Sequence, residues 1–219
     1  MENKEKMKSQ KIRTALYNVL PGEKAHSKMA PRPKFIEGIE GIHSCPPVNS
    51  AILALIIPFE NELAIPFIKR VNAGKYHGGQ IAFPGGKMEK DDANTLQTAL
   101  RECHEEIGVP EERVSILGVL SDIYIPLSNF NITPIVGVTL QKPEFTLSEG
   151  EVEKVIMVKL SELFDDKNKT TSSFYRHEHK IVAPGYKIGD NFIWGATAMI
   201  IAELEQLMKM NTLNQLGKL

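Results

Sequence analysis

The amino-acid sequence predicts an α/β fold in which helices pack on a mixed β-sheet. Short apolar runs of the kind that form strands recur from residue 51 to residue 193. A segment with helical periodicity interrupts them at Ala93–Ile107, and a further helix is predicted after them at Ala196–Met210. The chain has 219 residues, of which 42% are hydrophobic, so it is long enough to fold as one domain around a substantial core.

The first 48 residues differ in composition from the rest of the chain. Apolar side chains in residues 12–20 fall on one stripe of a helix, whereas residues 21–48 are rich in proline. Proline favours extended backbone and ends helices. We therefore predict that residues 1–48 form an N-terminal helix and an extended arm packing on a core domain made of residues 49–219.

The core elements follow from runs of apolar or β-branched residues between turn residues, with polar stretches as loops. The first two strands are expected to form a hairpin across Glu60–Glu62. In chain order, the predicted elements are strands at Ala51–Phe59 and Leu63–Lys69, a Gly-rich segment at Gly74–Gly86, the helix at Ala93–Ile107, strands at Ile116–Ile123, Ile132–Leu140 and Val152–Val158, a short helix near Leu160–Phe164, a loop at Asp165–Ser173, and two pairing strands at Phe174–Val182 and Tyr186–Ile193.

Charge and cysteine content limit the classes of partner. The net charge is -1, so no basic field attracts nucleic acid, and a small anionic ligand is expected instead. The two cysteines, Cys45 and Cys103, form no CxxC motif, which argues against a disulfide scaffold or a thiolate metal site. No apolar run is long enough to cross a membrane, and Met1–Lys11 is too charged for a secretory signal. These features predict a cytoplasmic protein.

Three carboxylates of the helix at Ala93–Ile107 are spaced to share one face. Glu102, Glu105 and Glu106 stand at i, i+3 and i+4, and an apolar stripe lies roughly opposite. That stripe consists of Leu96, Leu100, Cys103 and Ile107. Clustered carboxylates repel one another unless a cation compensates, and hard cations such as Mg²⁺ or Mn²⁺ prefer oxygen ligands. The alternative for this spacing alone is a solvated acidic face.

The surrounding residues favour the metal site over the solvated face. A Gly85-Gly86 turn precedes the helix, Arg101 lies four residues before Glu105 and could orient it, and Gly108 is placed as the C-cap. This segment resembles the Nudix box, in which a Gly and an isolated Glu precede Arg-Glu-aliphatic-x-Glu-Glu-x-Gly-aliphatic. The matching residues are Gly86, Arg101, Glu102, Glu105, Glu106, Gly108 and Val109.

The match departs from the Nudix box at three points. Asp92 stands where the isolated Glu is expected, one extra residue separates Gly86 from Arg101, and Cys103 replaces an aliphatic residue. The extra residue resembles the branch of Nudix hydrolases that act on coenzyme A. A second signature of that branch lies upstream, and the segment Arg70–Gly86 resembles it at Arg70, His77, Gly79, Gln80 and the Phe-Pro-Gly-Gly run.

The resemblance implies a Nudix-type α/β/α sandwich with a mixed β-sheet and a magnesium- or manganese-dependent hydrolase. Water would attack a pyrophosphate linkage of coenzyme A or its derivatives, giving 4′-phosphopantetheine and adenosine 3′,5′-bisphosphate. Glu102, Glu105 and Glu106, with the carbonyl of Gly86, are the expected metal ligands, and Glu102, Glu105 and Glu151 the expected catalytic residues. Arg70, Lys75, His77 and Gln80 are the expected substrate-binding residues.

Alternatives remain at several positions and for the function. Gln80 could instead hold backbone groups in place. Glu149, Glu151 and Glu153 alternate along the chain, so they would form either a functional face or a solvated edge of a strand.

The alternative substrates are ADP-ribose or a nucleoside triphosphate. A non-catalytic nucleotide-sensing module is less favoured, since it would be expected to lose metal-binding carboxylates. A small-molecule nucleotide is the expected partner, without nucleic acid or membrane, and a homodimer is a further expectation from the resemblance.

Overall fold

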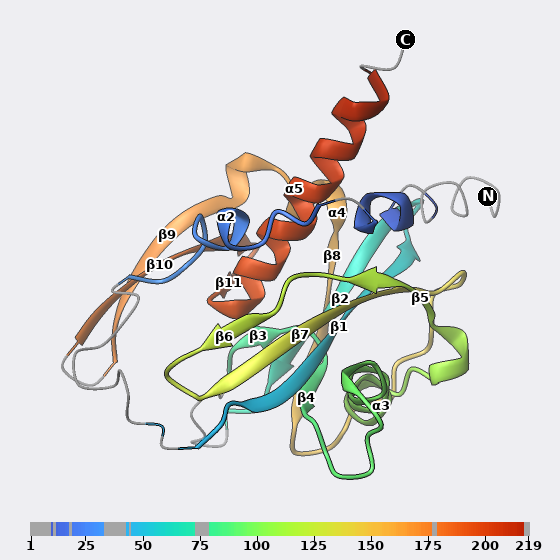
Figure 1. Cartoon of the computed structure of the whole chain (residues 1–219), viewed down its shortest axis with the longest axis horizontal. Coiled ribbons are helices and arrows are strands. Elements are labelled where there is room, and N and C mark those ends of the chain that lie inside the picture. Colours follow the sequence, from blue (N-terminus) through green and yellow to red (C-terminus); the bar gives the residue numbers. More distant parts are fainter. Residues whose placement is uncertain are drawn as a thin grey trace.

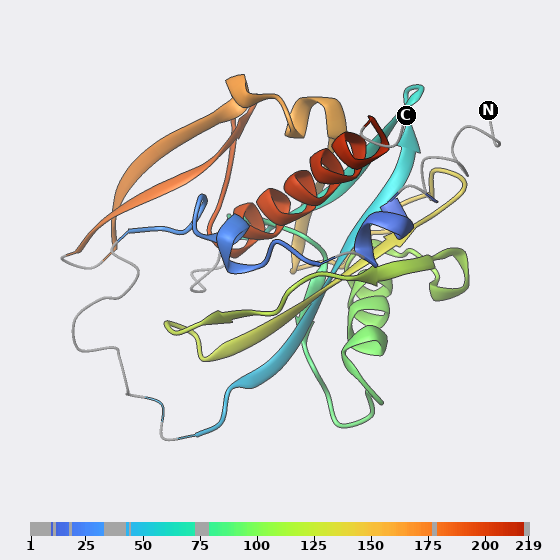
Figure 2. The ribbon, with the colours of Figure 1, turned by 45° about the horizontal axis from the view of Figure 1, so that its top comes forward.

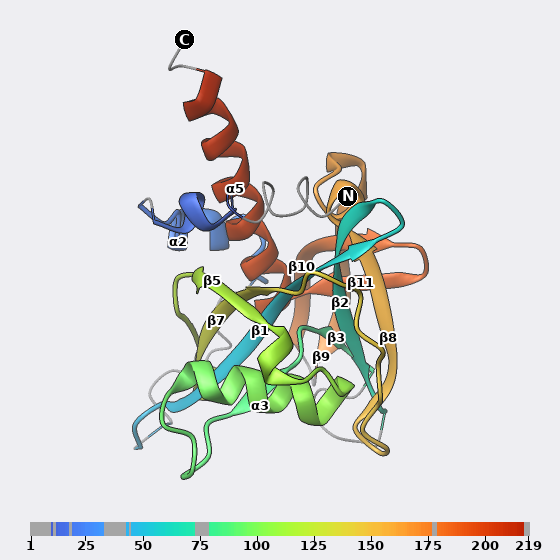
Figure 3. The same cartoon turned by 90° about the vertical axis from the view of Figure 1, so that its right-hand side faces the viewer.

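A computed structural model describes residues 10, 12–17, 19–32, 43, 45–72, 79–176 and 179–216 of the chain. In these residues, eight strands form a large mixed sheet, and a three-stranded sheet lies beside it (Figure 1). Helix α3 (Thr95–Ile107) covers one face of the large sheet, and helix α5 (Ala196–Leu216) lies on the opposite side (Figure 3). The predicted α/β architecture with a mixed sheet is therefore confirmed.

The large sheet is built around its longest strand, β1 (Val48–Phe59). This strand pairs antiparallel with β2 (Glu62–Arg70) and parallel with β7 (Phe130–Val138). The two residues between β1 and β2, Glu60 and Asn61, have φ angles of 46° and 64°. Two left-handed residues in succession fit the tight turn that matches the twist of a hairpin. The predicted hairpin is confirmed, with a turn shorter than expected.

Shorter strands extend the large sheet. The order is β3-β2-β1-β7-β5, while β4 pairs with β1, β6 with β7 and β8 with β2. Their bounds are β3 (Ile81–Ala82), β4 (Gly85–Lys87), β5 (Ser115–Val119), β6 (Ile123–Ile125) and β8 (Val152–Lys159). The prediction of one strand over Ile116–Ile123 is wrong, because the chain leaves the pairing after Val119 and rejoins β7 as β6. The strands β3 and β4 lie in the Gly-rich segment, where no strand was predicted.

The second sheet consists of β9 (Lys169–Arg176), β10 (His179–Ile188) and β11 (Asn191–Trp194), all antiparallel. It lies on the same side of the large sheet as α5, and α5 contacts both β10 and β11 (Figure 2). The predicted loop at Asp165–Ser173 is wrong beyond residue 168, because β9 begins at Lys169 and pairs along β10. The predicted strand Phe174–Val182 is wrong for the same reason, since it crosses from β9 into β10.

The core divides into two layers because successive residues of β1 point to opposite faces of the sheet. Leu53 and Leu55 belong to a cluster under α3, whereas Ala54 and Ile56 belong to a larger cluster that includes α5 and the second sheet. This division is the packing expected of a three-layer sandwich. The short helices are α2 (Glu23–His26), α4 (Leu160–Leu163) and two 3₁₀ turns, Glu111–Arg113 and Asp166–Asn168.

The described part of the N-terminal segment lies over the α5 side of the sheet. Residues 12–16 are helical and bury Ile12 in the larger cluster, and α2 contacts α5. Arg32 forms an isolated antiparallel bridge with Val182 of β10. Across the described part of the chain, no helix combines the length and apolar character needed to span a membrane.

Candidate active site

The helix with the carboxylates has defined caps at both ends. The Asn94 side chain accepts a hydrogen bond from Gln97 N at 3.0 Å, and Gln97 Oε1 accepts one from Ala93 N at 2.9 Å. This reciprocal pair satisfies backbone donors at the helix start. Gly108 ends the helix with a φ of 73°, and its N–H donates to His104 O. The predicted C-cap is confirmed, and the helix starts two residues later than predicted.

A buried carboxylate, Asp92, fixes the central arginine of the helix. Arg101 donates from Nε to Asp92 Oδ1 at 3.0 Å and from Nη2 to Oδ2 at 2.9 Å. Asp92 also accepts hydrogen bonds from Glu89 N and Thr98 Oγ1. The hydrogen bonds from Arg101 lower the pKa of Asp92 well below its usual range, although burial opposes this. Sequence analysis gave Asp92 no role, yet it holds the loop before α3 to the helix.

Arg101 also reaches two of the predicted metal ligands. Its Nη1 lies 3.0 Å from Glu102 Oε1 and 2.9 Å from Glu105 Oε2. The expectation that Arg101 orients Glu105 is therefore confirmed. Because Nε and Nη2 are held by Asp92, the Nη1 group has a fixed position from which it aligns both carboxylates.

Glu106, near the end of α3, is buried and only 1% exposed. Its Oε2 accepts a hydrogen bond from Gly85 N at 2.8 Å, and its Oε1 lies 3.1 Å from Nη2 of Arg70. Burial raises the pKa of Glu106 to about 7, against the effects of Arg70 and Gly85. The expected separation of a carboxylate face from an apolar stripe is wrong here, because Glu106 lies three residues from buried Cys103 and faces the sheet.

Arg70 connects the Gly-rich segment with the helix. Its Nη2 donates to Gly85 O at 2.9 Å as well as facing Glu106. Its backbone N–H donates to Gln80 O, and Gly79 N donates to Arg70 O. The guanidinium is thus engaged with protein atoms, which makes Arg70 a positioning residue for the Gly85 backbone and Glu106.

Glu102 packs directly against Gly86. A Cβ atom added to Gly86 would lie 2.4 Å from Glu102 Oε1 and 2.5 Å from its Cδ. Glycine is therefore required for this carboxylate to reach the strand β4. Burial raises the pKa of Glu102, while Arg101 lowers it. A half-buried carboxylate packed against the Gly86 backbone offers oxygen ligands of the kind that hard cations prefer.

We predict that Gly86→Ala lowers activity about tenfold or more without unfolding the protein, since displacing the Glu102 carboxylate from its expected place beside the metal weakens metal binding. The clash is with the flexible end of Glu102, so the side chain can move away while the backbone stays. Thermal unfolding and metal titration of the purified variant measure the two effects.

Gly85→Ala is the matched control, because a Cβ there meets backbone atoms, Ala51 O at 2.4 Å and Ile52 Cα at 2.6 Å. It is expected to lower the unfolding temperature. Equal unfolding temperatures for the two variants, or an unchanged metal affinity in Gly86→Ala, would contradict the assigned roles.

The remaining predicted residues lie in different places. Glu151 is exposed in the turn before β8, and its carbonyl accepts a hydrogen bond from Val71 N at 2.9 Å. The charge of Glu151 contributes to raising the pKa of Glu106, so the two carboxylates are neighbours. The expected alternating face of Glu149, Glu151 and Glu153 is wrong, because only Glu153 belongs to a strand. The predicted substrate-binding residues Lys75 and His77 lie outside the described residues.

The donor set fits a divalent cation, although its side chains do not yet converge. In the described residues, no three Asp, Glu, His or Cys side chains stand together as ion ligands. Burial is the largest cause of the raised pKa values of Glu102 and Glu106, and repulsion between carboxylates is a further cause. Glu105 raises the pKa of Glu102, and Glu102 and Glu151 raise the pKa of Glu106. A cation bound by these oxygens would relieve that repulsion.

Comparison with known proteins gives consistent matches. A model of the NUDIX domain matches residues 49–177. An "Uncharacterized Nudix hydrolase NudL" of Enterobacter sp. (strain 638) is 35% identical over 161 residues, which are 72% of this chain and 82% of that protein. The NudL protein of Citrobacter koseri is 34% identical over 152 residues, 64% of this chain and 78% of that protein. A solved structure, the Nudix hydrolase RenU of M. smegmatis, is 14% identical with a TM-score of 0.49, covering 80% of this chain and 90% of that chain.

Proposed function

The chain belongs to the Nudix family, and we propose that it cleaves the pyrophosphate bond of coenzyme A or one of its derivatives. The products would be 4′-phosphopantetheine and adenosine 3′,5′-bisphosphate. The support for a Nudix hydrolase acting on a nucleotide derivative comes from the family match. The support for coenzyme A comes from the segment Arg70–Gly86, which resembles the second signature of the coenzyme A branch.

One contact carries the proposal. Arg70, at the start of that upstream segment, contacts both Gly85 at its end and Glu106 of the carboxylate helix. The two sequence signatures, which are separate in the chain, therefore form one structural unit around the Gly85–Gly86 turn. Such a unit is expected if the upstream segment shapes the site at which the carboxylates act.

Divalent cations, which Nudix hydrolases generally use, would be held here by Glu102, Glu105, Glu106 and the carbonyl of Gly86. When bound, Mg²⁺ or Mn²⁺ would neutralise phosphate oxygens and acidify a coordinated water. The protein's contribution is to hold the ligands: Asp92 fixes Arg101, and Arg101 aligns Glu102 and Glu105.

Two exposed carboxylates, Glu105 and Glu151, are the candidates for accepting the proton of the attacking water. The Glu105 side chain is 57% exposed, and Glu151 lies in an open turn next to Glu106. In the reaction, the water oxygen forms a bond to one phosphorus, its proton passes to a carboxylate, and the P–O–P bridge breaks. Each product then carries one of the two phosphates.

The test is a panel of coenzyme A, oxidised coenzyme A, an acyl thioester, ADP-ribose and a nucleoside triphosphate, each incubated with Mg²⁺ or Mn²⁺. We expect coenzyme A or a derivative to have the highest kcat/KM, with 4′-phosphopantetheine and adenosine 3′,5′-bisphosphate separated by chromatography. A higher kcat/KM for ADP-ribose or the triphosphate would replace the proposed substrate. No turnover of any compound in the panel would count against the proposed hydrolysis itself.

A further inference from the structure

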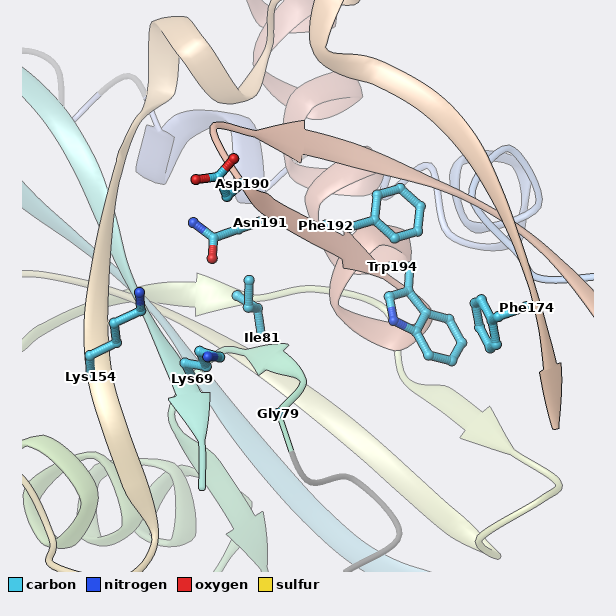
Figure 4. A pocket seen from close by; sticks show the side chains of 9 residues that line it. All are labelled: Lys69, Gly79, Ile81, Lys154, Phe174, Asp190, Asn191, Phe192 and Trp194. Atoms are coloured by element: carbon cyan, nitrogen blue, oxygen red, sulfur yellow. The ribbon is translucent and has the colours of Figure 1, made fainter. Parts of the chain in front are cut away.

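A cavity of about 470 Å³ lies between the large sheet and the second sheet. One wall comes from β2, β3 and β8 and carries Lys69, Ile81 and Lys154; the other comes from β9 and β11. Figure 4 shows the lysines and the aromatic side chains on opposite sides of the cavity, with Ile81 between them. The volume falls within the range of about 300 to 1,000 Å³ that is typical of small-molecule sites.

Two lysines face each other across the strands of the first wall. Lys69 of β2 is the direct register partner of Lys154 of β8, and both line the cavity. Like charges directly opposite on an antiparallel pair destabilise the sheet. Lys69 is partly compensated by Glu153 at 2.7 Å, whereas Lys154 has no ion-pair partner among the described residues. A bound anion would compensate both ammonium groups, so this wall is suited to a phosphate.

The second wall is aromatic. Trp194 of β11 packs edge-on against Phe174 of β9, with ring centroids 4.6 Å apart. Phe192 lies two residues before Trp194 on the same strand, so the two rings share a face, and all three are only partly buried. Partly exposed aromatic rings of this kind provide a stacking surface for a nucleobase.

Polar groups at the rim of the cavity complete a nucleoside site. Asp190, in the turn before β11, and Asn191, the first residue of β11, also line the cavity. A carboxylate can accept a hydrogen bond from an exocyclic amino group, and an amide can both donate and accept. The combination of stacking rings, an amino-group acceptor and paired ammonium groups matches an aminated base whose sugar carries a phosphate.

We propose that this cavity binds the nucleoside end of the substrate, with the base against Trp194 and a phosphate on its ribose between Lys69 and Lys154. The inference rests on the proposed function in taking that substrate to be a nucleotide derivative. Lys69 and Arg70 are adjacent at the end of β2, so the cavity that Lys69 lines and the Glu106 carboxylate that Arg70 contacts lie near the same end of this strand. In a coenzyme A derivative the pyrophosphate is attached directly to the 5′ carbon of the ribose, so a nucleoside in the cavity would have the pyrophosphate beside it.

The experiment uses Trp194, the only tryptophan of the chain, as a fluorescence probe. The full-length protein is titrated with adenosine 3′,5′-bisphosphate in the absence of added metal. Binding is expected to change the Trp194 emission. Lys154→Gln is expected to raise the dissociation constant for adenosine 3′,5′-bisphosphate about tenfold or more, because a charge-assisted contact is lost. AMP, which lacks the 3′-phosphate, should bind more weakly and respond little to the same substitution.

The control variant is Lys159→Gln, which removes a lysine from the same strand, β8, at its other end beside Glu60. It should bind adenosine 3′,5′-bisphosphate like the unmodified protein. No emission change on titration, or equal affinities for Lys154→Gln and the unmodified protein, would overturn the proposal.

The two proposals fail in different ways. Binding without hydrolysis of coenzyme A would reject the proposed substrate but retain the nucleoside cavity. Conversely, hydrolysis of coenzyme A with the same KM in Lys154→Gln would retain the substrate and reject the cavity. Because titration without added metal needs no turnover, a defect of the carboxylate site does not affect its outcome.

Discussion

Glu105→Gln is expected to lower kcat about a thousandfold, the loss that follows when several kcal/mol of charge stabilisation disappear from a metal-assisted transition state. The substitution should leave the fold unchanged. The Glu105 side chain is 57% exposed, and its one ion pair, with Arg101, lies on the protein surface. Such pairs contribute less than about 1 kcal/mol to stability, and the glutamine oxygen can accept the same hydrogen bond. The measurement is kcat with saturating Mg²⁺ or Mn²⁺, beside thermal unfolding of the same preparation.

Glu112→Gln is the matched control for this prediction, because it removes an exposed carboxylate just beyond the same helix, in the 3₁₀ turn Glu111–Arg113. It should retain full kcat. If Glu105→Gln unfolds at the normal temperature and still turns over at the normal rate, Glu105 has no part in catalysis. The assignment of the carboxylate helix as the site of chemistry would then have to rest on Glu102 and Glu106 alone.

Local signals in the sequence predicted the elements that depend mainly on neighbouring residues. The hairpin of β1 and β2 follows from two long apolar runs around a polar turn, and the middle of each strand is buried. Helix α3 follows from its periodicity and from Gly108, the left-handed cap. In both cases the chain's own pattern and the tertiary packing require the same conformation.

Elements that depend on distant partners were missed. Strand β9 begins with polar residues, Lys169 to Ser173, which resemble a loop in isolation but pair along β10. Sheet pairing, which sequence propensity does not record, decides this segment. The same holds for the Gly-rich strand β4, which is a strand because it pairs with β1.

The candidate active site was likewise predicted only in part from the sequence. The spacing of Glu102, Glu105 and Glu106 correctly indicated that all three belong to a single helix. It could not indicate that Glu106 would be buried, since this depends on Arg70 and Gly85 from other elements. The role of Asp92 was missed because its partner, Arg101, lies nine residues away and is brought to it only by the turn before α3.

A buried glutamate far from the carboxylate helix joins the N-terminal segment to the core. Glu203 of α5 is fully buried and accepts hydrogen bonds from Gly22 N at 2.9 Å, from Ser121 Oγ at 2.7 Å and from Ser121 N at 3.2 Å. Its Oε2 also lies 2.8 Å from Nε2 of His26. Burial disfavours the charged form of Glu203, but the hydrogen bonds outweigh it, so the pKa is lowered.

Glu203→Ala is therefore expected to lower the free energy of unfolding by about 3 kcal/mol or more, because it leaves buried His26 and the partly buried donors of Gly22 and Ser121 without their acceptor. For a domain of this size, that corresponds to a decrease of roughly 6–12 °C in the unfolding temperature. Gln206→Ala provides the control: Gln206 is on the same helix and bonds the same N-terminal segment, but its contact with Lys28 is exposed. That variant should lose no more than about 0.5 kcal/mol.

The pH dependence of the unfolding temperature separates the contribution of the Glu203 charge from that of a neutral side chain of the same size. A carboxyl whose folded pKa is lowered stabilises the fold above its ordinary value of 4.5, and this contribution is lost as the pH falls through the folded pKa. The difference in unfolding temperature between the unmodified protein and Glu203→Gln should thus be largest near neutral pH and shrink below about pH 4.5. Because glutamine keeps nearly the same volume, a difference that stays constant as the pH falls would mean that neutral hydrogen bonds, and not the charge of Glu203, hold the N-terminal segment to α5.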